Sequence, residues 1–217
     1  MSSIKWRVQP ENILSSSLVI PVIVIHDLEQ TLAMAEALFA GGIKVLEITL
    51  RTPAALDALK LLTQKFPEQL IGAGTVINAE QLQEVIAAGA KFAFSPGQTR
   101  ELLLAGKEQP IPLIPGITTV SELMEAMSLG YKHFKFFPAA LAGGIPMLRT
   151  FYSLFPEIKF CPTGGINQQN CAEYLALPNV SCVGGSWLVS EEAIKNAKWS
   201  HITNLCLSVK KRGIGTI

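Results

Sequence analysis

A single lysine stands among three phenylalanines in the stretch His133–Pro138, and its chemistry is considered first. Side chains alternate between two faces of an extended strand, so His133, Lys135 and Phe137 share one face. Apolar surroundings disfavour an ammonium group and leave some neutral amine, which can attack a ketone to form an imine. A lysine at a strand end that reaches solvent is the simpler alternative. Lys135 is therefore a candidate nucleophile, and the rest of the chain has to decide between the two interpretations.

A second polar stretch, Val45–Arg51, carries Glu47, Thr49 and Arg51 on one face by the same alternation. A glutamate inside an apolar strand is costly unless it is paired or used chemically. Two hypotheses account for Glu47: a buried ion pair with Arg51, or a role in proton transfer.

Small residues end three of the predicted strands. They are Gly72-Ala73-Gly74-Thr75, Gly164-Gly165 after Thr163, and Gly184-Gly185 before Ser186. Glycine lets a ligand approach the backbone closely, and the loops after strands 7 and 8 of a barrel form a recurrent phosphate site. Tight turns without a ligand would use the same residues. The two glycine pairs, one in each of those loops, favour a phosphate site.

Eight short runs rich in β-branched and aromatic residues alternate with amphipathic helical stretches. The predicted strands are Val19–Ile25, Val45–Leu50, Ile71–Thr75, Phe92–Pro96, Pro112–Ile117, His133–Pro138, Lys159–Ile166 and Ser181–Trp187. Pro53 and Asn78 are expected at the starts of two of the intervening helices. Strict alternation of strands and helices predicts a parallel α/β sheet that is buried on both faces.

Eight units favour a closed (β/α)8 TIM barrel over an open doubly wound sheet. The open sheet would favour a glycine-rich turn after its first strand, where this chain has His26-Asp27-Leu28. Residues 1–217 are expected to form one domain, with residues 1–17 as an extra N-terminal helix and residues 18–217 as the barrel.

The composition excludes several classes of function. Of the 217 residues, 49% are hydrophobic and 16% are charged, and the net charge of +1 gives no electrostatic case for nucleic acid or an anionic membrane. No apolar run approaches the ~20 residues of a membrane helix, and the first 17 residues lack the apolar core of a signal peptide. The four cysteines form no C-x-x-C pair. The sequence therefore predicts a cytoplasmic protein with no metal and no cofactor, and with no nucleic-acid or membrane partner.

Five motifs together resemble one enzyme family, in order and in spacing. They are Leu46–Thr52, Gly72–Thr75, Phe134–Pro138, Cys161–Ile166 and Gly184–Leu188. The family is that of the 2-keto-3-deoxy-6-phosphogluconate (KDPG) aldolases, also called 4-hydroxy-2-oxoglutarate (KHG) aldolases. The resemblance implies a metal-free class I lyase with a homotrimeric barrel.

The resemblance also implies roles for individual residues. Lys135 would form the Schiff base, Glu47 would act as the acid and base, and Arg51 and Thr75 would bind the substrate carboxylate. The complete expected substrate-binding set is Arg51, Thr75, Pro96, Phe137, Thr163, Gly164, Gly165, Gly184, Gly185 and Ser186. The family carries a basic pair where this chain has His26-Asp27, so no basic contact is expected from that loop.

The expected reaction is cleavage of KDPG, a phosphorylated 2-keto acid, to pyruvate and glyceraldehyde 3-phosphate, with KHG as a further substrate. The imine on Lys135 would serve as the electron sink for C3–C4 cleavage while Glu47 takes the proton of the C4 hydroxyl. Two alternatives stay open: a phosphate-binding barrel isomerase or epimerase that uses Glu47 as a base without an imine, and a non-catalytic sugar-phosphate binding protein. The sequence leaves open the preference between KDPG and KHG, and the stereochemistry at C4.

Overall fold

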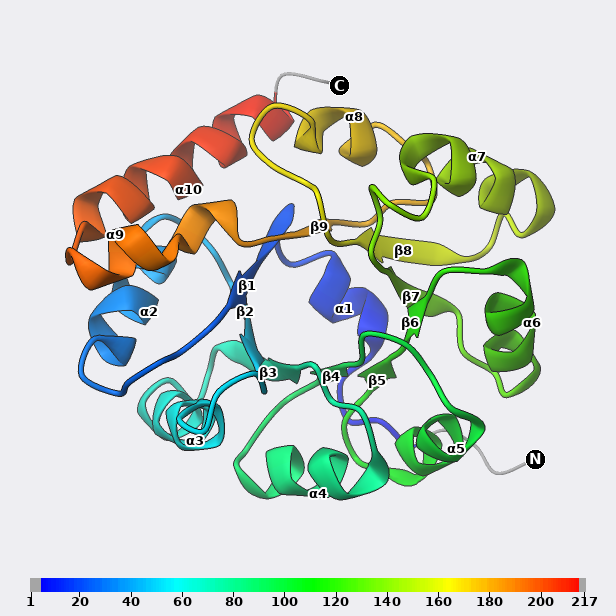
Figure 1. The fold of residues 1–217 in the computed structure, drawn as a ribbon, viewed down its shortest axis with the longest axis horizontal. Coiled ribbons are helices and arrows are strands. Elements are labelled where there is room, and N and C mark those ends of the chain that lie inside the picture. The colour runs from blue at the N-terminus through cyan, green and yellow to red at the C-terminus, as the bar shows by residue number, and fades with distance from the viewer. Residues whose placement is uncertain (1–4, 215–217) are drawn as a thin grey trace.

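Parallel strands curve around a common interior in the computed structural model, which describes residues 5–214 (Figure 1). The strands are β1 (Val19–Ile23), β2 (Val45–Thr49), β3 (Leu70–Gly74), β4 (Ala93–Phe94), β5 (Leu113–Ile114), β6 (Gly116–Ile117), β7 (His133–Phe136), β8 (Lys159–Pro162) and β9 (Val183–Gly185). All eight predicted strands are confirmed, and the fifth is divided into β5 and β6. The division falls at Pro115, because the proline nitrogen carries no hydrogen to donate to a neighbouring strand.

The helices that follow β1 along the chain lie on the outside of this curve (Figure 1). They are α2 (Thr31–Ala40), α3 (Ala55–Lys65), α4 (Ala79–Ala87), α5 (Arg100–Glu108), α6 (Val120–Ser128), α7 (Gly144–Leu154), α8 (Cys171–Leu175), α9 (Glu191–Lys195) and α10 (Trp199–Ile214), with a 3-10 turn η1 (Trp187–Val189). Asn78 caps α4 as predicted, because its side chain accepts a hydrogen bond from the Gln81 backbone N–H. Pro53 lies in the turn before α3 rather than inside it. No helix within residues 5–214 is long and apolar enough to cross a membrane.

The sheet consists of two parallel arcs. One has the order β5-β4-β3-β2-β1-β9 and the other the order β6-β7-β8. The parallel bridges Phe160↔Val180 and Thr163↔Gly184 connect β8 to the segment that contains β9. The expected α/β architecture with a parallel sheet is confirmed as a curled sheet covered by helices on its outer face.

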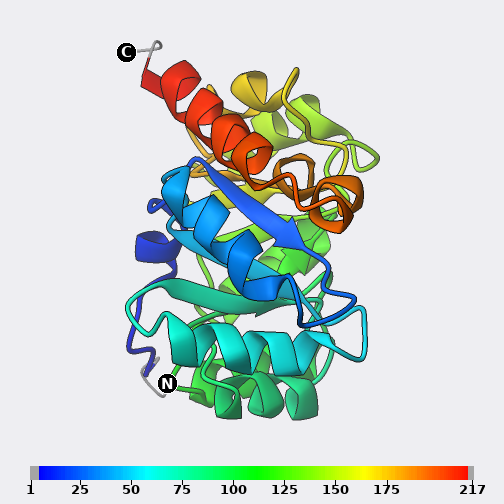
Figure 2. The same cartoon turned by 90° about the vertical axis from the view of Figure 1, so that its left-hand side faces the viewer.

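The last helix packs against α2, which comes from the early part of the chain. α10 lies alongside α2 (Figure 2), and the Thr203 hydroxyl donates a hydrogen bond to the Ala37 carbonyl over 2.9 Å. A Cβ at Gly41 would overlap Cys206, so the glycine allows α10 to approach closely. β1 also pairs with β9, so the first and last strands are neighbours in the sheet.

Alternation along each strand divides its side chains between the outer helices and the interior. On β2, Leu46 and Ile48 pack in the core cluster shared with the outer helices, while Val45 packs in a separate inner cluster. The inner cluster consists of Ile13, Leu14, Ile20, Val45, Phe92, Phe94, Ile114, Cys161 and Cys182. The polar residues discussed below share the inward face with these apolar side chains.

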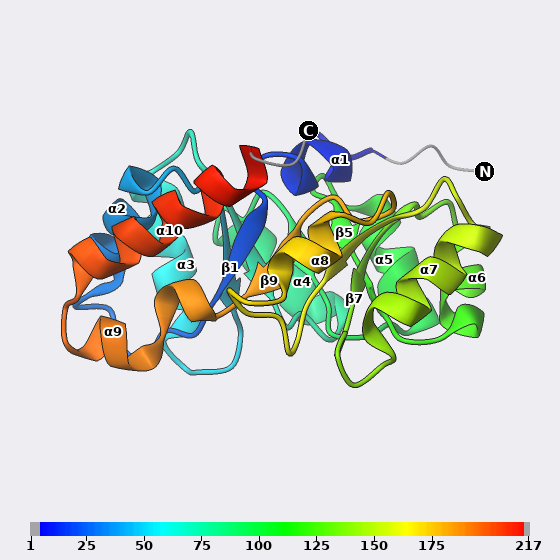
Figure 3. The same cartoon turned by 90° about the horizontal axis from the view of Figure 1, so that it is seen from above.

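The N-terminal helix is shorter than the predicted segment. α1 spans Pro10–Leu14, and residues 1–4 of the predicted helical segment lie outside the described residues. Ile13 and Leu14 are fully buried against Ile20 and Val45, which lie near the starts of β1 and β2. α1 therefore covers the end of the sheet where the strands begin (Figure 3), and the opposite end remains for the polar residues.

Candidate active site

Lys135 and Glu47 meet in the interior from opposite arcs of the sheet. The Lys135 Nζ lies 2.7 Å from the Glu47 Oε1, and the two side chains are 3% and 1% exposed. Lys135 therefore does not reach solvent, and the simpler interpretation of its strand is wrong. The buried Glu47–Arg51 ion pair is also wrong, because Glu47 pairs with Lys135 and Arg51 is exposed. A buried charge pair carries a desolvation penalty that close pairing only partly offsets, which favours a chemical use.

Two aromatic rings face the lysine nitrogen. The Lys135 Nζ lies 5.2 Å from the ring centroid of Phe94 and 5.6 Å from that of Phe137. Both distances are within the range of a cation–π interaction. Phe137 belongs to the predicted site, whereas sequence reasoning missed Phe94, since a phenylalanine in an apolar strand gives no signal that it faces a charge.

Gly74 makes room for the Glu47 carboxylate at the end of β3. A Cβ at Gly74 would overlap the Glu47 side chain, so the glycine predicted to admit a ligand instead admits a neighbouring side chain. The next residue, Thr75, has a φ of 62°, an uncommon left-handed conformation for a residue with a side chain. The Arg51 Nε donates to the Thr75 Oγ1 over 3.4 Å. Arg51 and Thr75 are thus brought together where β2 and β3 end.

The two glycine pairs have different surroundings. Gly164 and Gly165 have φ values of 97° and 76°, which favour glycine whether or not a ligand binds. Gly184 and Gly185 are buried. A Cβ at Gly184 would overlap the Thr163 hydroxyl.

A Cβ at Gly185 would overlap the ring of Trp187. Packing therefore accounts for glycine at positions 184 and 185, which belong to β9 and not to a tight turn. Gly165 and Ser186 are the members of the two loops that are exposed, so they are the ones that a ligand can reach directly. The binding role of the loops stays a prediction.

Pro96 is half-buried and lies beside the start of β6. A Cβ at Gly116 would overlap the Pro96 backbone, and Gly116 in turn pairs in register with Lys135. The fold thus brings Pro96 to the strand that neighbours the lysine, although its contact with a substrate stays a prediction.

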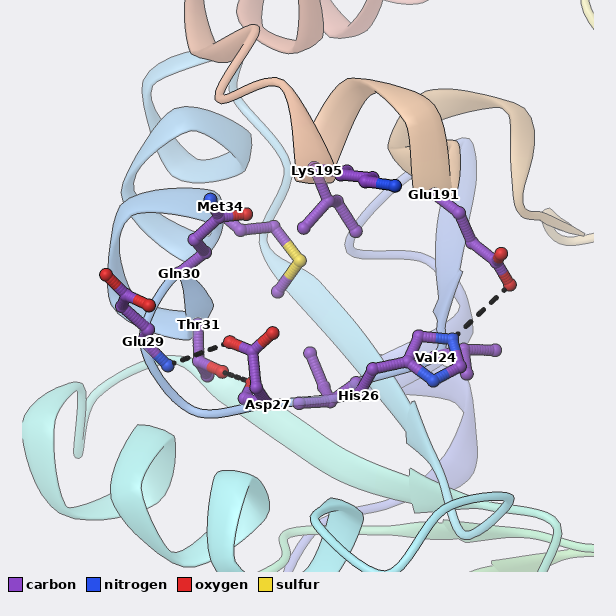
Figure 4. A pocket seen from close by; sticks show the side chains of 11 residues that line it. Val24, His26, Asp27, Glu29, Gln30, Thr31, Met34, Glu191 and Lys195 are labelled. Carbon is purple, nitrogen blue, oxygen red and sulfur yellow. Dashed lines mark hydrogen bonds and ion pairs between the residues drawn. The ribbon is translucent and has the colours of Figure 1, made fainter.

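The loop after β1 borders a separate cavity of about 340 Å³ (Figure 4). His26 points toward Glu191 at the start of α9, with 3.5 Å between Nε2 and Oε1, and both side chains are exposed. The Asp27 carboxylate accepts a hydrogen bond from the Glu29 backbone N–H over 3.0 Å. Lys135 and Glu47 do not line this cavity. The loop after β1 therefore borders a cavity separate from the Lys135–Glu47 pair.

Two thiols lie in the inner cluster with Phe94. Cys161 and Cys182 are buried, and burial, a hydrogen bond with Cys161 and the negative charge of Glu47 all raise the pKa of the Cys182 thiol. Cys182 therefore stays a neutral thiol at physiological pH. Within residues 5–214, no group of three or more His, Cys, Asp or Glu side chains is arranged to hold a metal ion.

Comparison with known families agrees with the motifs. The model of the KDPG and KHG aldolase family matches residues 11–205. The chain belongs to this family. It is 52% identical over 200 residues to the 2-dehydro-3-deoxy-phosphogluconate aldolase of Pseudoalteromonas atlantica, covering 92% of this chain and 93% of that protein. It is also 52% identical over 200 residues to the KHG/KDPG aldolase of Escherichia coli K12, covering 92% of this chain and 94% of that protein.

A solved structure extends the comparison to three dimensions. The crystal structure of KDPG aldolase from Legionella pneumophila superimposes with a TM-score of 0.93 at 65% sequence identity, covering 94% of this chain and 99% of that one. In that structure pyruvate is captured at low pH as a covalent carbinolamine intermediate. A carbinolamine is the addition product of an amine and a ketone, so the relative's chemistry is that of an amine nucleophile.

Proposed function

We propose that this protein is a class I aldolase that cleaves KDPG to pyruvate and glyceraldehyde 3-phosphate and that also acts on KHG. The observation that carries the proposal is the buried Lys135–Glu47 pair, in which an amine and a carboxylate lie 2.7 Å apart. Membership of the family and the covalent pyruvate adduct of the Legionella pneumophila relative support the same reaction. The non-catalytic binding protein has no need for such a pair, which is costly to bury.

Lys135 acts as the nucleophile in this proposal. Its amine adds to the C2 ketone, the carbinolamine loses water, and the resulting protonated imine accepts the electron pair of the C3–C4 bond. Pairing with Glu47 allows the ammonium proton to be transferred to the carboxylate directly, because the two groups are within hydrogen-bond distance. The surrounding aromatic rings and small exposed fraction of Lys135 exclude bulk water from the reacting nitrogen. After cleavage and protonation of the enamine, one water molecule hydrolyses the pyruvate imine, which releases pyruvate and restores the lysine amine.

Glu47 moves protons throughout the reaction. It takes the proton of the C4 hydroxyl during cleavage, directly or through one water, and later returns a proton to the enamine. Arg51 binds the substrate carboxylate with its planar guanidinium, and Thr75 contributes a hydroxyl beside it. Because Arg51 is exposed at the ends of the strands, it can meet the carboxylate as the substrate enters.

The phosphate end of the substrate binds at the loops after β8 and β9. Gly165 and Ser186 supply its exposed contacts, and the remaining members of the predicted set shape the backbone between them: Thr163, Gly164, Gly184 and Gly185. Pro96 and Phe137 complete the predicted substrate-binding set near the reacting centre.

We further propose that the curled sheet is a closed (β/α)8 barrel with α1 covering its N-terminal end, and that the chain is a single domain. Closure requires contact between the two arcs at both of their junctions. The bridges from β8 to the β9 segment support it at one junction, and the hydrogen bond from the Lys135 N–H on β7 to the Pro115 carbonyl after β5 supports it at the other. A homotrimer and a cytoplasmic location remain proposals from the family resemblance.

Borohydride trapping tests the proposed chemistry. We expect borohydride with pyruvate to fix a three-carbon adduct on Lys135, located by peptide mass mapping, and Lys135→Ala to lose nearly all cleavage of KDPG. Lys159→Ala is the matched control, because Lys159 lies on the neighbouring strand β8 but donates to the Pro178 carbonyl at the surface. An adduct on Lys159, or none at all with turnover intact, would contradict the proposal, and the absence of an adduct would favour the isomerase alternative.

Comparing two substrates tests the phosphate site. KHG has the same reacting centre as KDPG but no phosphate, so Ser186→Ala should lower kcat/KM for KDPG while leaving KHG nearly unchanged. Losing one hydrogen bond to a charged group costs ~1.5–3 kcal/mol, which corresponds to roughly a 10- to 100-fold decrease. Equal losses on both substrates would mean that Ser186 does not contact the phosphate.

A further inference from the structure

We propose that Phe94 sets the balance between the charged imine and the neutral enamine on Lys135 by presenting its aromatic face to the reacting nitrogen. This inference rests on the proposed Schiff base at Lys135 and adds a residue that the family motifs do not include. Phe94 lies on β4, and Lys135 lies on β7 in the other arc of the sheet.

The ring of Phe94 is held in a fixed position beside the lysine. It is 1% exposed, and its centroid lies 5.2 Å from the Lys135 Nζ. Phe92 packs against it edge-on, with 5.5 Å between centroids and an interplanar angle of 79°. Cys182 and other uncharged members of the inner cluster surround the ring, so water does not screen its effect.

The reacting nitrogen therefore has a carboxylate and an aromatic face as its neighbours. The Glu47 Oε1 lies 2.7 Å from the Lys135 Nζ, and the ring of Phe94 faces the same atom. Phe137 also faces the nitrogen, at 5.6 Å, but it is only half-buried. The Phe94 contact is more completely desolvated, and desolvation strengthens a cation–π interaction.

The effect depends on the charge of each intermediate. The face of a phenyl ring carries negative charge and attracts a cation. The free ammonium and the protonated imine carry the same charge, so the ring stabilises both and leaves the extent of imine formation nearly unchanged. The enamine forms when a proton leaves C3 of the pyruvate imine for the Glu47 carboxylate and the C–H electron pair moves toward nitrogen. Nitrogen is then neutral, and the attraction to Phe94 is lost.

Phe94 should consequently stabilise the protonated imine relative to the enamine and so lower the population of the enamine. Borohydride reduces the imine, whereas exchange of the pyruvate C3 hydrogens with deuterium oxide requires the enamine. The ratio of the exchange rate to the trapping rate therefore reports the balance. For Phe94→Leu we expect this ratio to rise by about 10-fold, within the range of a desolvated cation–π contact.

Phe151→Leu is the matched control, because it removes an equally buried phenylalanine ring that belongs to the core cluster shared with the outer helices and not to the inner cluster of Phe94. Its exchange and trapping rates should keep the wild-type ratio. Phenylalanine analogues with one, two and three ring fluorines at position 94 weaken the negative face while nearly preserving its shape, and the ratio should rise with each fluorine. This series also covers the case in which Phe94→Leu does not fold.

Three outcomes would overturn the inference: an unchanged ratio in Phe94→Leu, an equal rise in Phe151→Leu, or a ratio independent of fluorine number. Peptide mapping of the wild-type adduct separates these from failure of the proposed function. An adduct on Lys135 with an unchanged ratio rejects only the role of Phe94, whereas an adduct elsewhere rejects both proposals.

Discussion

The buried Lys135–Glu47 pair allows the structural and chemical roles of two residues to be separated. Lys135→Met leaves the Glu47 carboxylate at 1% exposure without a cation, and Glu47→Met leaves the ammonium at 3% exposure without an anion. Removing one partner of a buried pair typically costs ~3–5 kcal/mol, a large part of the ~5–15 kcal/mol that stabilises a domain. Replacing both partners leaves no uncompensated charge, and such double replacements often change the free energy of unfolding little.

Denaturant unfolding followed by circular dichroism measures this double-mutant cycle. Each single variant should lose ~3–5 kcal/mol of unfolding free energy, and the double Met variant should fall short of the sum by more than ~2 kcal/mol. Arg51→Met is the matched control, because Arg51 lies on the same segment but is exposed and not paired with Glu47; its effect should stay within ~0.5 kcal/mol. Additive losses in the double variant would refute the coupling on which the proposed nucleophile rests.

Three further results are expected. Burial is the largest cause that lowers the pKa of His133 below its usual 6.5. As the pH falls through 6.5, the unfolded chain therefore takes up the proton before the folded protein does, and the free energy of unfolding should decrease. His133→Gln should flatten this part of the curve of unfolding free energy against pH. Gly185→Ala should lower the melting temperature because its Cβ would overlap the Trp187 ring, and a variant with unchanged stability would contradict the packing explanation. Burial raises the pKa of Cys206 to about 12, so this thiol should react with Ellman's reagent at pH 8 only after unfolding; rapid reaction in the native state would show that α10 opens readily.

The strands could be predicted from the sequence because their signals are local. Runs of β-branched and aromatic residues mark each strand, and the period of two correctly places Lys135 inside and Phe134 and Phe136 in the outer core cluster. Asn78 likewise indicates the start of α4 through a hydrogen bond three residues away. The division at Pro115 and the shorter α1 depend on which neighbours each segment meets.

The partners of the inward-facing residues were decided only by the tertiary structure. Both Arg51 and Lys135 could pair with Glu47 on charge alone, and the curvature of the sheet selects Lys135 across 88 residues of sequence. The same curvature brings Phe94 over the lysine nitrogen and Thr163 against Gly184. A periodic pattern specifies which face a side chain occupies, because that depends on backbone geometry within a few residues. It does not specify what lies opposite, because that depends on how distant strands curve toward one another.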